Sequence, residues 1–207
     1  MTIPRSAGLQ RLIDAMRDAI AARESFPGSA KALADRSFEA LRQVAPESAE
    51  EVRASRLPVC DLLAEALAAA RAGPPSIARV ADAFAEIEAT LPWKRRANAE
   101  MSGRRFADNH AYAEILGPFG GLEPRGDVRI GVSLMAPDLQ YPDHHHPPEE
   151  LYLALSKGEW RQAEGPWHEP GLGGLVFNPS DVVHAMRSGE TPLLALWCLW
   201  TADRPFA

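Results

Sequence analysis

A run of three histidines, His144, His145 and His146, is followed by two prolines and by Glu149 and Glu150. On an extended strand, residues two apart share a face, so His144 and His146 are expected to point one way and His145 the other. Imidazole nitrogens and a carboxylate oxygen that converge on one point are typical ligands of a divalent transition metal, such as Zn, Fe, Mn, Co or Ni. The run therefore predicts part of a metal site that leaves positions open for a substrate.

A second motif offers the ligand that must come from another strand. Residues 173–188 read G-x5-P-x-D-x2-H-x3-S, in which the histidine is His184. The first run reads H-x-H-x3-E-x7-G from His144 to Gly158. Together the two motifs resemble the paired signature motifs of the cupin superfamily. The departures are an extra residue, Lys157, and less common residues at Asp138, Asp181 and Ser188.

The cupin resemblance implies a barrel built as a double-stranded β-helix. A lone histidine after Asp-Val-Val is more often a core residue, but the position of His184 in the second motif favours a ligand. We therefore expect one divalent metal bound by His146, Glu150 and His184, with His144 as a fourth protein ligand. His145 is expected to face solvent or to support the site from behind the ligands.

Two tyrosines, Tyr141 and Tyr152, flank the candidate ligands of the first motif, and residues 196–200 read Leu-Trp-Cys-Leu-Trp. With the long N-terminal region of helical character, these features resemble the cupin-type dimethylsulfoniopropionate (DMSP) lyases of marine bacteria, in the DddQ/DddL branch. The resemblance implies a carbon–sulfur lyase that cleaves DMSP by β-elimination to acrylate and dimethyl sulfide. It also implies that Tyr152 corresponds to the general base of those enzymes.

The reaction explains why these residue types are needed. Removal of a proton next to a carboxylate is difficult, because the existing negative charge opposes a carbanion, and a divalent metal on the carboxylate offsets that charge. Tyr152 shares a strand face with Glu150, so its phenol is expected beside the metal, which favours ionisation. Tyr141 is expected to bind the carboxylate or to relay a proton. Cation–π contact with the sulfonium group is expected from Trp197 or Trp200.

Two other kinds of function remain open, because a fold does not decide function. Another metal-cupin enzyme, a dioxygenase or a sugar isomerase, would use the same ligands and would be identified by oxygen-dependent turnover or a sugar substrate. A non-catalytic small-molecule-binding cupin, such as a regulator, would normally carry a basic DNA-binding helix. Residues 1–100 contain 14 Lys and Arg against 14 Asp and Glu, which argues against such a helix.

The elements that must position these residues fall into two regions. Apolar residues at helical spacing, with breaks at proline, predict helices near 7–25, 29–45, 58–72 and 76–91. From residue 117 onward, 11 of the 15 glycines and 11 of the 18 prolines separate short apolar runs, which predict strands near 128–135, 149–156, 174–178, 182–187 and 192–200. We expect an α+β fold, with an α-helical region over 1–105 that covers the barrel or forms a homodimer contact, and a cupin β-barrel over 106–207.

The composition excludes several classes of function. The chain has 207 residues, 46% hydrophobic and 24% charged, with a net charge of −6, which is ordinary for a globular protein. Nucleic-acid binding is not expected, because it requires clustered cations, and the one basic run, 94–96, is expected in a solvated loop. No run approaches the ~18 apolar residues of a membrane span, and no signal-peptide pattern begins the chain, so we expect a cytoplasmic location. His110 and His168 match neither motif and are expected at the surface.

Overall fold

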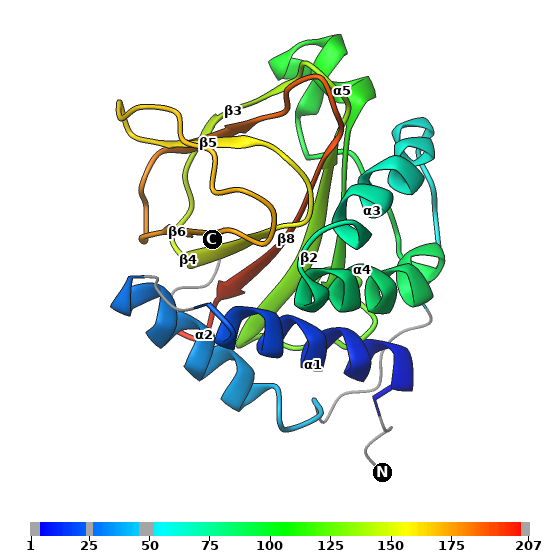
Figure 1. The fold of residues 1–207 in the computed structure, drawn as a ribbon, viewed down its shortest axis with the longest axis vertical. Coiled ribbons are helices and arrows are strands. Elements are labelled where there is room, and N and C mark those ends of the chain that lie inside the picture. Colours follow the sequence, from blue (N-terminus) through cyan, green and yellow to red (C-terminus); the bar gives the residue numbers. More distant parts are fainter. Residues whose placement is uncertain (1–4, 24–26, 46–51, 204–207) are drawn as a thin grey trace.

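The computed structural model of the chain describes residues 5–23, 27–45 and 52–203, and its N-terminal half is helical (Figure 1). Ser6 caps the first helix, because its hydroxyl accepts a hydrogen bond from the backbone N–H of Leu9 at 3.3 Å. The helices are α1 (Ala7–Ala21), α2 (Gly28–Ala40), α3 (Leu63–Arg71), α4 (Pro75–Ile87) and α5 (Arg104–Asn109), with 3-10 turns at Pro58–Leu62, Glu88–Thr90 and Ala99–Ser102.

The C-terminal half forms two antiparallel sheets, with strand orders β1-β2-β8-β4-β6 and β3-β7-β5. From β2 onward, each strand along the chain belongs to the other sheet from the strand before it, which is the winding of a double-stranded β-helix. The strands are β1 (His110–Leu116), β2 (Val128–Met135), β3 (Gln140–His144), β4 (Glu149–Ala154), β5 (Glu159–Gln162), β6 (Leu175–Asn178), β7 (His184–Arg187) and β8 (Leu193–Trp200). The expected α+β fold with a cupin barrel is confirmed.

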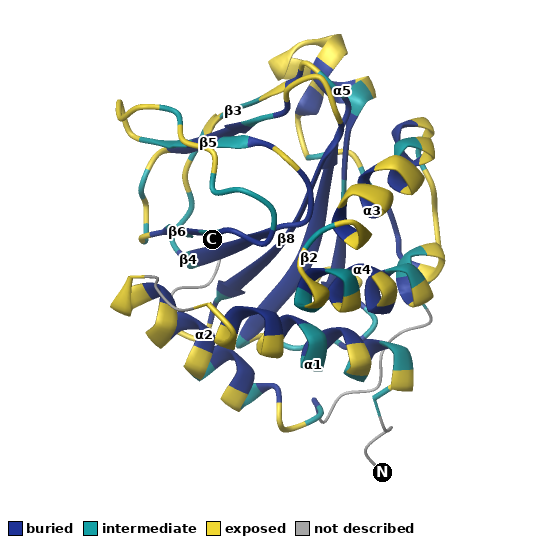
Figure 2. Ribbon diagram, viewed as in Figure 1, coloured by how far each residue is buried: buried dark blue, intermediate teal, exposed yellow. Residues whose placement is uncertain are grey.

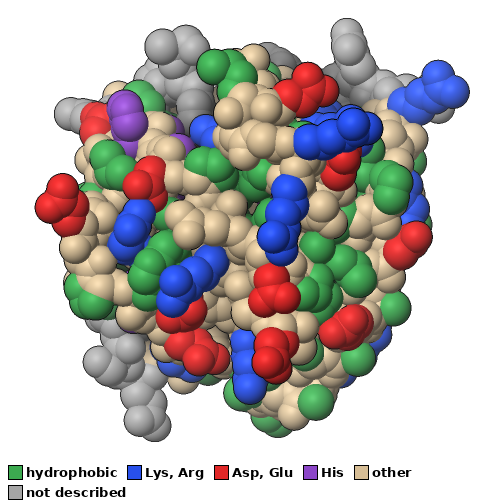
Figure 3. Space-filling model, turned by 90° about the horizontal axis from the view of Figure 1, so that it is seen from above, with side chains coloured by type: hydrophobic (Ala, Val, Ile, Leu, Met, Phe, Trp, Pro, Cys, Tyr) green, Lys and Arg blue, Asp and Glu red, His purple; other side chains and the backbone are tan. Residues whose placement is uncertain are grey.

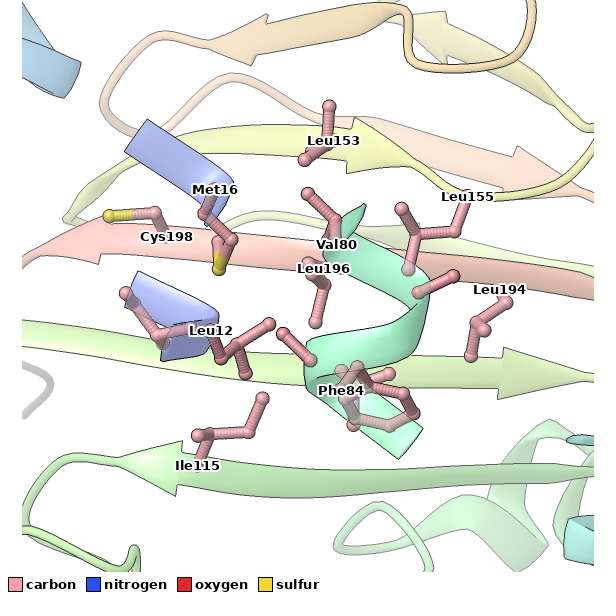
Figure 4. Close-up of a cluster of buried hydrophobic side chains, with 14 of the residues drawn as sticks. Leu12, Met16, Val80, Phe84, Ile115, Leu153, Leu155, Leu194, Leu196 and Cys198 are labelled. Carbon is pink, nitrogen blue, oxygen red and sulfur yellow. The ribbon is translucent and has the colours of Figure 1, made fainter. Parts of the chain in front are cut away.

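Both faces of the five-stranded sheet are covered, one by the helices and the other by the interior of the barrel, and its strands are buried almost throughout (Figure 2). The outer face packs on the helices, and Figure 4 shows this core for Leu12, Met16, Phe84, Leu153, Leu194 and Leu196. The inner face contributes Tyr152, Trp197 and Leu199 to a second cluster inside the barrel. Because side chains alternate along a strand, each strand of this sheet supplies one set of residues to the helices and the other set to the barrel interior.

The expected elements agree with most of the described chain. The helix expected over 29–45 ends at Ala40, and the last two residues of the one expected over 7–25 lie outside the described residues. All five expected strands are present with ends shifted by at most two residues. Three strands, β1, β3 and β5, and helix α5 were not expected. The division between 105 and 106 falls inside α5 and stays a prediction.

The surface shows no segregation of charge on the face drawn in Figure 3, where cationic and anionic side chains are interspersed. Searched over the described ranges, no helix is both long enough and apolar enough to cross a bilayer.

Candidate metal centre

Three imidazoles meet at one end of the barrel. His144 ends β3 and stands opposite His184, the first residue of β7, in the register of these two strands. His146 follows β3 by two residues, so a turn and not a regular strand brings it to the other two rings. One ligand nitrogen from each of the three rings lies within 4.8 Å of the other two.

Backbone hydrogen bonds fix which nitrogen of each ring faces the others. A carbonyl oxygen only accepts, so the ring nitrogen beside it must carry the proton, which leaves the lone pair of a neutral ring on Nε2. This arrangement is the one that metal-binding histidines use. Each Nδ1 donates at 2.9–3.0 Å to a carbonyl two residues away, in the pairs His144–Pro142, His146–Pro148 and His184–Val182.

Glu150 completes the cluster. Its carboxylate oxygen Oε2 lies 3.4 Å from Nε2 of His146 and 3.2 Å from Nε2 of His184, and its side chain is buried. Among the described residues, no atom meets the hydrogen-bond criteria with the buried Nε2 of His184. Burial, aided by the neighbouring His184, lowers the pKa of His144 to about 3, so that ring is neutral at pH 7. Lone pairs and a carboxylate that face one another need a cation between them, so this donor set fits a divalent metal.

The cluster opens onto a cavity of about 530 Å³ inside the barrel, and Tyr152 forms part of its wall. Tyr152 is only 4% exposed and lies on the same face of β4 as Glu150. Burial raises the pKa of the Tyr152 phenol well above its ordinary value, and the nearby Glu150 carboxylate raises it further through its charge and a hydrogen bond. In the absence of a cation the phenol therefore keeps its proton.

Tyr141 lies in the same wall, between groups from separate elements. Its ring is 4.6 Å from the ring of His144 and 5.0 Å from that of His110, and the guanidinium of Arg96 lies 5.2 Å from its centre. Burial raises the pKa of Tyr141 to about 12, so its hydroxyl is a hydrogen-bond donor at neutral pH.

Two expectations from the sequence are wrong at this wall. Arg96 does not lie in a fully solvated loop, because it is half-buried and contributes to the cavity. His110 is not a surface residue: it is 2% exposed, and neither ring nitrogen has a hydrogen-bond partner within the part of the chain that the structure describes. Burial, followed by the charges of Arg96 and His144, lowers the pKa of His110 to about 3.

Strands β1 and β2 place further residues in the cavity wall that were not expected from the sequence. Tyr112, Arg129 and Ser133 all contribute to it. The sequence does contain a pattern that could have indicated them. Polar residues at 110, 112 and 114 alternate with apolar ones, residues 128–134 alternate in the same way, and such alternation is typical of a strand with one polar and one apolar face. Arg129 is paired at 2.6 Å with the buried carboxylate of Glu114, so its charge is balanced inside the barrel.

The two tryptophans of β8 have different surroundings. Trp197 lines the cavity and is 5.6 Å from the guanidinium of Arg129. Trp200, also expected to bind substrate, lies in a separate surface depression beneath Arg36. The reason is parity: residues three apart on a strand point to opposite faces, so Trp197 and Trp200 cannot both face the cavity.

The position of Trp197 depends on Gly131, which stands opposite it in the pairing of β2 with β8. A Cβ atom on Gly131 would lie 2.1 Å from the Trp197 ring and 2.6 Å from the carbonyl oxygen of Ala113. Gly131→Ala is therefore expected to lower the free energy of unfolding by about 1–3 kcal/mol, measured by thermal or urea unfolding. Gly126→Ala is the matched control, because its Cβ would meet nothing within 4 Å. Equal stability of the two variants would contradict the prediction.

Comparison with known proteins places this geometry in a family. The sequence model of the DMSP lyase (dimethylsulfoniopropionate lyase) family matches residues 29–195. The chain is 33% identical over 127 residues to the dimethylsulfoniopropionate lyase DddQ of Ruegeria pomeroyi, a match that covers 61% of this chain and 62% of that protein. It is 30% identical over 122 residues to the putative dimethylsulfoniopropionate lyase DddL of Cereibacter sphaeroides, covering 58% of this chain and 50% of that protein. The matches therefore span between half and two thirds of these relatives' lengths.

Solved structures agree in fold. The crystal structure of the DMSP lyase DddQ from Ruegeria pomeroyi superposes with a TM-score of 0.63 at 26% identity, over 94% of each chain. A chain from a study of the DMSP lyases RdDddP and RnDddQII superposes with a TM-score of 0.69 at 24% identity, over 96% of this chain and 94% of that chain. The resemblance expected from the first motif with its tyrosines, residues 196–200 and the helical N-terminal region is thereby confirmed, and the chain belongs to the DMSP lyase family.

Proposed function

We propose that the protein is a metal-dependent lyase that cleaves DMSP by β-elimination to acrylate and dimethyl sulfide. The observation that carries the proposal is the cluster of three imidazole nitrogens and the buried Glu150 carboxylate, at a cavity that the phenol of Tyr152 also lines. The names of the relatives DddQ and DddL support the choice of substrate.

The ligands would be His146, Glu150 and His184, with His144 as the fourth. When bound, a divalent ion would supply positive charge that offsets the substrate carboxylate and favours ionisation of Tyr152. Three of the four ligands are histidines, which suits Zn, Fe, Mn, Co or Ni better than Mg or Ca.

Tyr152 would remove the proton from the carbon next to the carboxylate. Its phenol is hydrogen-bonded to the Glu150 carboxylate, so it lies beside the position where the ligand atoms converge. As the base takes the proton, the electron pair of the broken C–H bond forms the C=C bond of acrylate, and the C–S electrons leave with dimethyl sulfide. Tyr141 would donate a hydrogen bond to the carboxylate or relay the proton, because its hydroxyl stays protonated at neutral pH.

Trp197 would bind the sulfonium group. An aromatic ring attracts a cation by about 0.5–2 kcal/mol. Trp197→Leu is therefore expected to raise KM for DMSP by about 2- to 30-fold. Trp200→Leu, the same change outside the cavity, is expected to leave KM unchanged. Initial rates over a range of DMSP concentrations check both, and an equal effect of the two substitutions would remove Trp197 from the substrate site.

The experiment that tests the proposed function is incubation of the purified protein with DMSP after removal of bound metal and reloading with Zn, Fe, Mn, Co or Ni in turn. Gas chromatography of dimethyl sulfide and liquid chromatography of acrylate measure turnover. Equal amounts of the two products that depend on added metal are expected. Turnover that consumes oxygen, or turnover of a sugar only, would assign the site to another metal-cupin reaction instead.

Location and assembly stay predictions. A cytoplasmic location is checked by fractionation of the source cells. A homodimer is checked by light scattering of the purified chain.

A further inference from the structure

Two of the candidate ligands come from different sheets. Glu150 lies on β4 of the five-stranded sheet, and His184 lies on β7 of the three-stranded sheet. The 3.2 Å between their ligand atoms therefore depends on contacts that hold the two sheets at a set separation. Backbone ladders cannot supply these contacts, because each ladder joins strands within one sheet.

A pair of side-chain amides crosses between the sheets at this level. Asn178 on β6 stands opposite Glu150 in the strand register, and Gln162 on β5 stands opposite His184. Nε2 of Gln162 donates to Oδ1 of Asn178 at 2.8 Å, and Nδ2 of Asn178 donates to Oε2 of Glu150 at 2.9 Å. Asn178 is fully buried. The amide bridge, defined as Gln162 and Asn178, thus runs from the partner of one ligand to the partner of the other.

The amide bridge has one polarity. Nε2 of Gln162 also donates to the backbone carbonyl of Phe177, which can only accept, so the amino group of Gln162 must face this side. Its other hydrogen points to the oxygen of Asn178, and the amino group of Asn178 is left to face Glu150. The reverse orientation of Asn178 would set its amide oxygen against a carboxylate oxygen, which is repulsive.

We propose that Gln162 and Asn178 are positioning residues for the metal centre, and that the amide bridge sets metal affinity by holding the Glu150 carboxylate toward His184. Neither residue is a ligand in this proposal, which rests on the proposed metal site. Partners that orient metal ligands typically contribute 10- to 100-fold to metal affinity.

The test measures the apparent Kd for Co²⁺ of the full-length protein, by competition with a chromophoric chelator. Asn178→Leu is expected to weaken binding by about 10- to 100-fold and to alter the visible absorption of bound Co²⁺, which reports coordination geometry. Gln162→Leu is expected to weaken binding by more than about twofold and by up to about tenfold, because Asn178 can still donate. The double variant is expected to bind as Asn178→Leu does, since Gln162 acts through Asn178. Gln162 is only half-buried, so its variant keeps the test decisive if Asn178→Leu does not fold.

Ser156→Ala is the matched control. The hydroxyl of Ser156, which follows β4, also makes buried hydrogen bonds: it donates to the carbonyl of Pro192 and accepts from the backbone N–H of Leu194. It is expected to lower stability without changing the Kd for Co²⁺. The proposal is overturned if the Kd for Co²⁺ of Asn178→Leu, or of Gln162→Leu in its place, is within twofold of the wild-type value. It is also overturned if the losses of Co²⁺ affinity in the two single variants add in the double variant, or if Ser156→Ala weakens Co²⁺ binding as much as Asn178→Leu does. Wild-type protein that binds no Co²⁺ would overturn the metal site itself, and this inference with it.

Discussion

Tyr152→Phe is expected to release dimethyl sulfide from DMSP about 10²- to 10⁴-fold more slowly than wild type, which is the usual contribution of a positioned general base. The substitution keeps the ring, so packing against Trp160, whose ring lies 6.0 Å away, is retained. It removes one hydrogen bond to Glu150 and leaves all four candidate metal ligands in place. The loss is therefore expected in kcat, with metal content and KM close to wild type.

Tyr141→Phe is the comparison that separates the two tyrosines. If Tyr141 binds the substrate carboxylate, its variant is expected to raise KM more than it lowers kcat. Metal content by elemental analysis and unfolding temperature are measured for both variants. Near-wild-type turnover of Tyr152→Phe would eliminate Tyr152 as the base and leave Tyr141 as the next candidate.

Local spacing correctly predicted that Glu150 and Tyr152 share a strand face, because both lie on one continuous strand. The period of two that places both side chains on one face is a property of β4 alone, so sequence suffices to find it. His144 and His146 also reach one cluster, as expected, while His145 is exposed, but a regular strand does not bring them there. β3 ends at His144, and the ring of His146 is turned toward the cluster by its own hydrogen bond to Pro148.

Other features escaped because they depend on which strands become neighbours. β3 is an edge strand that contains Pro142 and pairs with β7 in an irregular register. Edge strands tolerate proline, but a proline in a short run makes the sequence pattern of a strand hard to recognise. β1 has alanine at 111 and 113, which is a poor strand former, although its polar positions alternate regularly. Arg96 reaches Tyr141 from a loop 45 positions earlier in the chain, and no local pattern indicates that approach.

Electrostatic balance inside the barrel is likewise a product of the tertiary structure. Arg129 would be costly as a lone buried cation, and it is acceptable because β1 brings Glu114 to it from the neighbouring strand. By contrast, the Glu150 carboxylate lies beside Nε2 of His146 at 3.4 Å and Nε2 of His184 at 3.2 Å, and these rings are charged only when they are protonated. The charge of the Glu150 carboxylate is therefore balanced by what the imidazoles bind, a proton or a divalent metal.

The four donors of the cluster predict how metal binding changes when two of them are removed. His146→Ala/His184→Ala deletes two of the four donors and is expected to weaken divalent metal binding by more than about 10³-fold, because structural four-ligand sites bind with roughly 10–16 kcal/mol in total. Dimethyl sulfide release is expected to fall with the metal. Elemental analysis after dialysis against a chelator measures the first effect, and gas chromatography measures the second.

The unfolding temperature gives a test that does not depend on activity. A metal that binds only the folded chain stabilises it by RT ln(1 + [L]/Kd), so the wild-type unfolding temperature is expected to rise with metal concentration. In the double variant this rise with metal concentration is expected to disappear, whatever the unfolding temperature of its metal-free form. His168→Ala, at an exposed position outside the cluster, is expected to keep the full rise. Full metal retention by a folded double variant would show that the metal is bound elsewhere, because the remaining pair, His144 and Glu150, offers too few donors to hold it.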